Sequence, residues 1–130
     1  SDPSAGASAE VVRRLAPLVP VYVGVISQLV TTLALGGAGA LCFEADVAPE
    51  LCLEVVTRFR TGDLEGLRRD FSRLLQLNAV LSRFQNPRSV KAAMPFVGLP
   101  GGALRRPYLE LEAAEVAAIA ESLTALGLTA

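Results

Sequence analysis

The feature that most constrains this chain is a long stretch without charge. Residues 15–43 contain no Asp, Glu, Lys or Arg, and the stretch is long enough to cross a bilayer as a helix. However, Pro17 and Pro20 interrupt its start, and three glycines interrupt its end. A helix in lipid must satisfy its backbone hydrogen bonds internally, which these residues oppose. We therefore expect buried elements of an α/β fold, with a membrane-associated helical protein as the weaker alternative.

The uncharged stretch contains two short apolar runs separated by a helical pattern. The β-branched run VYVGV, residues 21–25, predicts a strand, and residues 39–43 predict a second one. The helix expected between them ends at glycine, which commonly terminates helices. A strand, a helix and a strand in this spacing predict a right-handed parallel βαβ unit. The glycines precede the second strand, which is the wrong order for a phosphate-binding loop.

The remainder of the chain predicts helices only. Pro49 suits the first turn of a helix that runs to about Arg60, and Asp63 suits the N-cap of the next. Further helices are expected after Asn86 and over residues 112–126. Two strands with open edges do not form a stable sheet. We therefore expect an α/β fragment of a larger fold, with residues 1–60 as βα units and 61–130 as a helical extension.

The helix expected after Asp63 has an apolar stripe with one polar member. Asn78 stands within this stripe, and a local hydrogen bond is the simpler interpretation, with a role in helix register as the alternative. The stripe recurs at spacings of three and four residues and comprises Leu64, Leu67, Phe71, Leu74, Asn78 and Leu81.

Composition excludes several classes of function. The chain has no histidine, so a His-dependent triad and a His-ligated metal within it are excluded, and we expect neither metal nor cofactor. Its 12 basic and 13 acidic residues give a net charge of −1, which argues against nucleic acid as a partner. Hydrophobic residues make up 52%, so we expect much of the surface to be covered, as in a homo-oligomer.

The cysteines and the first residues bear on location. Cys42 and Cys52 do not form a CxxC motif and are expected to be free thiols. The opening residues SDPSAGASAE lack the basic start and apolar core of a signal peptide. These features predict a cytoplasmic protein, or a mitochondrial one if the source is eukaryotic.

Four segments, in order, carry a resemblance to a known family. They are GGAGALCFEADVAPEL (36–51), RTGDLEGLRRDFSRLLQL (60–77), NPRSVKAAMPFVGL (86–99) and LRRPYLEL (104–111). Together they resemble the C-terminal part of the dihydrodipicolinate synthase / N-acetylneuraminate lyase family of Schiff-base class I aldolases. The LALGGAGALC segment and the GLPGG loop are also similar to the 4-hydroxy-2-oxoglutarate aldolase branch.

The resemblance implies a fold and an activity. It implies the last two βα units of a (β/α)8 TIM barrel, followed by a helical extension. It also implies a lyase in which a lysine forms an imine with pyruvate or another 2-oxo acid. That lysine is expected at or before Ser1, so the 130 residues alone are predicted to be inactive. The alternative is a non-catalytic truncated homologue or an assembly module.

The resemblance also assigns substrate-lining positions. Gly24 matches a glycine that lines the substrate pocket, and Leu41 matches a strand-eight residue whose backbone carbonyl faces the imine. No catalytic residue is expected within the chain. Lys91 is the only lysine, but it matches a structural position of the Asn-Pro-x-x-Val-Lys motif.

Two acids interrupt the segment that resembles strand eight. Glu44 and Asp46 are two residues apart, so on a strand they would share one face. Paired carboxylates can perform acid–base chemistry. The simpler interpretation is a strand end whose acids face solvent or arginine partners.

Overall fold

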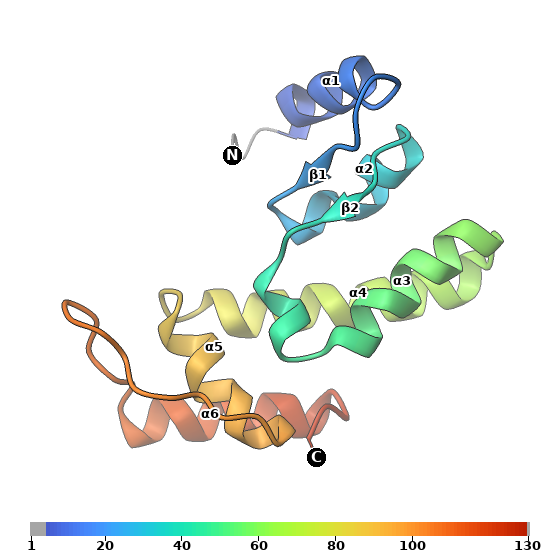
Figure 1. Cartoon of the computed structure of the whole chain (residues 1–130). Coiled ribbons are helices and arrows are strands. Elements are labelled where there is room, and N and C mark those ends of the chain that lie inside the picture. The colour runs from blue at the N-terminus through green and yellow to red at the C-terminus, as the bar shows by residue number, and fades with distance from the viewer. Residues whose placement is uncertain (1–4, 130) are drawn as a thin grey trace. The chain divides into compact units, whose positions relative to one another are not determined.

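The computed structural model describes residues 5–129 of the chain, and Figure 1 shows them in chain order. Short parallel strands occur early in the chain, and helices make up most of the rest. In order, the elements are α1 (Ala5–Leu15), β1 (Tyr22–Val23), η1 (Ile26–Gln28), α2 (Leu29–Ala34), β2 (Gly39–Ala40), η2 (Phe43–Asp46), α3 (Pro49–Thr61), α4 (Leu64–Ser82), α5 (Arg88–Ala93), η3 (Met94–Val97) and α6 (Ala113–Ala125).

The predicted strand–helix–strand unit is present, with shorter strands than expected. β1 and β2 pair in parallel, with Tyr22 opposite Gly39 and Val23 opposite Ala40. Among the described residues each strand pairs only with the other, so β structure is limited to the residues that are in register. The helix between them ends as predicted, because Gly36 adopts a φ of 86°, a conformation that favours glycine.

The chain divides into two compact units. The first comprises residues 5–42 and 53–70, and the second comprises residues 43–52 and 71–129. The buried apolar side chains of the first unit come from α1, β1, η1, α2, α3 and α4; they are Val12, Val23, Ile26, Leu29, Leu33, Val55 and Leu67. The predicted boundary near residue 60 between βα units and a helical extension stays a prediction.

The second unit has a core of fully buried leucines. Leu74, Leu77 and Leu81 of α4 are each 0% exposed. This confirms the predicted apolar stripe at Leu74 and Leu81, whereas Leu77 was not among its predicted members. Leu64, at the start of the stripe, is 74% exposed, because it stands in the first turn of α4. α5 packs against α6 within this unit. The Arg73 side chain also donates a 2.8 Å hydrogen bond from Nη2 to the carbonyl oxygen of Leu126, at the C-terminal end of α6.

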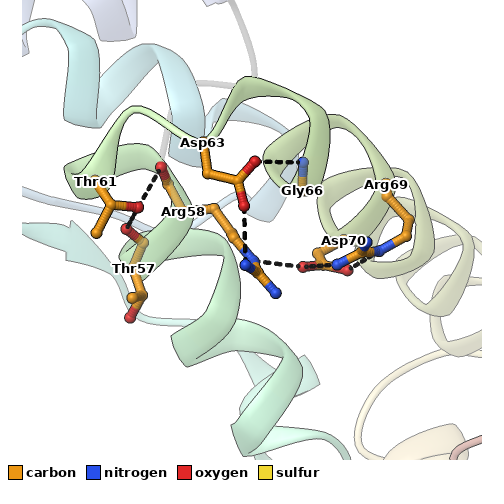
Figure 2. A network of polar contacts seen from close by, with 7 residues as sticks. All are labelled: Thr57, Arg58, Thr61, Asp63, Gly66, Arg69 and Asp70. Carbon is orange, nitrogen blue, oxygen red and sulfur yellow. Dashed lines mark hydrogen bonds and ion pairs between the residues drawn. The ribbon is translucent and has the colours of Figure 1, made fainter.

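A network of charged groups joins α3 to α4 within the first unit (Figure 2). Asp63 caps α4, since its Oδ1 accepts a 2.9 Å hydrogen bond from the backbone N–H of Gly66, as predicted. Arg58 bridges two acids, at 2.8 Å to Asp63 and 3.2 Å to Asp70. Arg69 donates to both carboxylate oxygens of Asp70, at 2.9 and 3.1 Å.

This network lowers the pKa of both aspartates. For Asp70, whose side chain is 1% exposed, the hydrogen bonds from Arg69 are the main cause; Arg58 adds to them and burial opposes them. For Asp63, the hydrogen bond from Gly66 is the main cause, and Arg58 assists. Both carboxyl groups are therefore held in the charged form that stabilises the turn between the helices.

No helix among residues 5–129 has the length and apolar character that a membrane span requires.

Candidate functional site

The structure brings Gly24 and Leu41 to the same edge of the sheet. Each residue directly follows a strand, Gly24 after β1 and Leu41 after β2. The parallel register, continued by one residue, places the two side by side. The backbone N–H of Leu41 donates a 2.9 Å hydrogen bond to the carbonyl oxygen of Val23, which extends the pairing to this point. Ligands of parallel α/β folds bind beyond this end of the strands.

The side chains around this edge are apolar and exposed. Leu41 is 74% exposed and Tyr22 of β1 is 55% exposed. On α1 of the same unit, Val11 is 50% exposed. A small hollow lies between α1 and β1, lined by Val11, Val12, Tyr22 and Gly24 among others. The edge therefore offers apolar surface and space. Neither Gly24 nor Leu41 has a side chain that could act as an acid, base or nucleophile.

The two acids after β2 do not lie on a strand. Phe43–Asp46 form the short 3₁₀ helix η2, so the prediction that Glu44 and Asp46 share one strand face is wrong. Asp46 is exposed, as the simpler interpretation expects. Glu44 is 1% exposed, and the expectation that it faces solvent or arginine is wrong. The turn of η2 therefore directs the Glu44 carboxylate into the protein and the Asp46 carboxylate toward solvent.

Glu44 instead pairs with Asn78 of α4, inside the second unit. The Asn78 Nδ2 donates a 2.5 Å hydrogen bond to Glu44 Oε1. The local bond expected for Asn78 is therefore wrong, because its partner stands 34 residues away in the sequence. The other carboxylate oxygen, Oε2, is buried and accepts no hydrogen bond from residues 5–129. Sequence reasoning missed this pair; a polar residue in an apolar stripe was the only signal of it.

Lys91 lies on α5 and is held by the loop that follows η3. Its Nζ donates hydrogen bonds to the carbonyl oxygens of Gly101, at 3.0 Å, and Ala103, at 2.9 Å. A Cβ atom at Gly101 would collide with the backbone carbonyl oxygen of Lys91, so the loop approaches α5 closely only because this residue is glycine. These contacts give the ammonium group a structural role, as its position in the motif implies.

A match to a family model shows which family the chain belongs to. The family model described as the dihydrodipicolinate synthetase family matches residues 5–126. The chain belongs to this family. The single matched range includes both strands, the α3–α4 pair, the loop that holds Lys91, and α6.

Individual relatives agree with this assignment. The chain is 35% identical over 96 residues to a 4-hydroxy-tetrahydrodipicolinate synthase of Anaeromyxobacter dehalogenans, covering 74% of this chain and 32% of that protein. It is 38% identical over 96 residues to the enzyme of the same name from Hyphomonas neptunium, covering 74% and 33%. The chain thus spans about a third of the length of these curated relatives.

A solved structure shows the same fold. A prophage protein of the dihydrodipicolinic acid synthase family from E. coli K12, in complex with pyruvate, matches with a TM-score of 0.84 at 23% identity. The match covers 97% of this chain and 44% of that protein. The described elements therefore form an α/β arrangement, rich in helices, that occurs within TIM-barrel proteins of this family.

Proposed function

We propose that these residues supply the last two βα units and the C-terminal helical extension of a Schiff-base lyase or aldolase. Its substrate would be pyruvate or a related 2-oxo acid. The observation that carries the proposal is the position of Gly24 and Leu41, adjacent at the end of two parallel strands, in a chain of this family. That edge is where TIM-barrel enzymes bind their substrates.

The chemistry assigns a supporting role to this chain. In such lyases a lysine amine attacks the ketone carbon, water leaves, and a protonated imine remains. The imine then draws in the electron pair of the carbon–carbon bond that breaks. The resemblance implies that this lysine would fall at or before Ser1, and the Lys91 ammonium group donates hydrogen bonds to two loop carbonyls. The apolar surface at Leu41 would lower the polarity around the lysine and so its pKa, which frees the amine to attack.

Gly24 would leave room for the substrate. Because it has no side chain, it allows a 2-oxo acid to approach the strand end closely. The exposed apolar side chains of the first unit would be covered by the preceding strands of the barrel. The experiments below use the encoded chain, by which we mean the full polypeptide that the gene encodes. The high share of hydrophobic residues also favours a homo-oligomer of the encoded chain, which light scattering would test.

Exchange of the pyruvate methyl protons tests the proposal without knowledge of the second substrate. Imine formation makes these protons acidic, so the encoded chain in D2O should remove the methyl signal of pyruvate from the proton NMR spectrum. Gly24→Val should slow this exchange about tenfold or more by blocking the approach of pyruvate. Gly6→Val is the matched control, since a Cβ at Gly6 meets nothing within 4 Å.

The outcomes separate the alternatives. Exchange by the encoded chain, slowed by Gly24→Val alone, supports the proposal. An encoded chain that leaves the methyl signal intact would instead be the non-catalytic homologue or assembly module. If exchange is observed, release of pyruvate from 4-hydroxy-2-oxoglutarate would identify the aldolase branch.

A further inference from the structure

The second unit contains a pocket that the lyase chemistry does not use. It lies between α5, η3, the loop after η3 and the first half of α6, and has a volume of about 270 Å³. Most of its lining is apolar, with side chains from each of these elements: Ala92, Phe96, Leu104, Leu111 and Val116. A dry cavity of about 150 Å³ is large enough to bind benzene. By volume, this pocket is large enough for an aromatic ring and a polar group.

Two cations stand at the wall of this apolar pocket. Lys91 lines it and has no carboxylate within ion-pair distance among residues 5–129. Its ammonium group carries three N–H bonds, and the loop carbonyls of Gly101 and Ala103 accept two. The third is left for another acceptor.

Arg88 likewise retains unused donors. It donates from Nε to the carbonyl oxygen of Leu109 at 2.6 Å, and from Nη2 to that of Glu110 at 3.0 Å. Its Nη1 donates to no atom within the described part of the chain. Glu115 lies 3.8 Å from Nη2 and forms an ion pair with Arg88, so this guanidinium already has an acidic partner. The loop thus fixes both cations in place while leaving each of them donors to spare.

The charge at the pocket wall that has no acidic partner is that of Lys91. Arg88 is paired with Glu115, whereas Lys91 has no carboxylate within ion-pair distance in the described part of the chain. Burying a lone charge against an apolar wall is costly unless it is paired. A carboxylate would supply the missing pair, and an apolar group would fill the remaining space.

We propose that this pocket binds a small monocarboxylate with a compact apolar or aromatic group. The carboxylate accepts hydrogen bonds from Lys91 and Arg88, and the apolar group packs on Phe96, Leu104 and Val116. The pocket shares no lining residue with the strand edge at Gly24, and it needs neither an imine nor the proposed lyase activity. Pyruvate is too small to fill it, so the ligand class differs from that of the lyase.

Phenylacetate is the probe for the experiment. It has an aromatic ring and one carboxylate, and it lacks the ketone that an imine requires. Its binding to the encoded chain is measured by isothermal titration calorimetry, beside the neutral analogue phenylacetamide. Because the carboxylate gains charge-assisted hydrogen bonds, we expect it to bind at least about tenfold more tightly than the amide.

A variant that fills the pocket tests the location. Ala92→Phe places a ring in the space and leaves both cations unchanged, so it should weaken phenylacetate binding about tenfold or more. Ala79→Phe is the matched control, because Ala79 is exposed on α4 and does not line the pocket. Its circular dichroism and that of Ala92→Phe are compared with the parent to confirm folding.

The proposal is overturned by any of three results. These are no measurable binding of phenylacetate, equal binding of acid and amide, or a folded Ala92→Phe variant that binds as the parent does. Methyl-proton exchange of pyruvate is measured on the same samples. If the encoded chain binds phenylacetate but does not exchange the methyl protons of pyruvate, the lyase proposal alone is contradicted.

Discussion

Asp70→Asn tests whether the charged network holds the α3–α4 turn. The Asp70 side chain is 1% exposed and accepts three hydrogen bonds from two arginines, at distances of 2.9 to 3.2 Å. The substitution keeps the shape, removes the charge, and turns one acceptor into an amide group that donates. At least one arginine donor then faces another donor.

The free energy that Asp70→Asn should cost follows from the burial of Asp70 and the exposure of its arginine partners. A hydrogen bond to a charged group contributes about 1.5–3 kcal/mol when it is buried, whereas exposed ion pairs contribute about 0–1 kcal/mol. The side chains of Arg58 and Arg69 are 36% and 60% exposed, so the lower end of the first range applies. We expect a loss of about 2 kcal/mol in the local opening free energy, or roughly thirtyfold faster amide exchange.

Hydrogen exchange of the α3 and α4 amides in the encoded chain measures this effect. Glu65→Gln is the matched control, since Glu65 is exposed on the same helix and forms no ion pair among the described residues. It should change exchange by less than about threefold. Equal effects of Asp70→Asn and Glu65→Gln would refute a structural role for the network.

The contribution of Asp70 to stability should depend on pH in a definite direction. The pKa of Asp70 is lowered in the folded protein, chiefly by Arg69. The stability that the charged Asp70 contributes is therefore fully present above the pKa of about 3.9 in the unfolded chain. It is lost as the pH falls through the lower pKa of the folded protein. The difference between the parent and Asp70→Asn should be constant from pH 5 upward, on the order of 2 kcal/mol, and shrink below about pH 4. A difference that shrinks as pH rises from 5 to 7 would contradict this cause.

Two further substitutions concern the acids after β2. Asn78→Ala removes the donor to the buried Glu44 carboxylate and should destabilise the encoded chain by about 2 kcal/mol in urea unfolding, whereas Gln76→Ala, at an exposed position of α4, should cost much less. Equal midpoints for the two variants would show that the pair contributes nothing. Asp46→Asn should leave turnover nearly unchanged, because Asp46 is exposed; a hundredfold fall, about 2.7 kcal/mol of barrier, would reveal a chemical role.

Local signals in the sequence predicted the helices well. Gly36 ends α2, Asp63 caps α4, and Gly127 follows the closing helix with a φ of 65°. Each of these depends on a backbone conformation or a hydrogen bond within a few residues, which sequence patterns record directly.

Long-range features were not predictable in the same way. Glu44 was expected at a strand end, yet η2 turns it inward to Asn78. No spacing rule links two polar residues on elements 34 positions apart, because their meeting depends on tertiary packing. The strands were predicted too long because β-branched composition marks an extended run, whereas strand pairing also needs a neighbour in register.

Borohydride trapping with pyruvate tests the central claim most directly. Reduction of an imine fixes pyruvate to its lysine, and peptide mass mapping locates the adduct. We expect the encoded chain to be trapped at a lysine outside these 130 residues, and the 130-residue segment, whose only lysine is Lys91, to keep its mass. An adduct on Lys91, or an encoded chain that pyruvate and borohydride leave unmodified, would contradict the account.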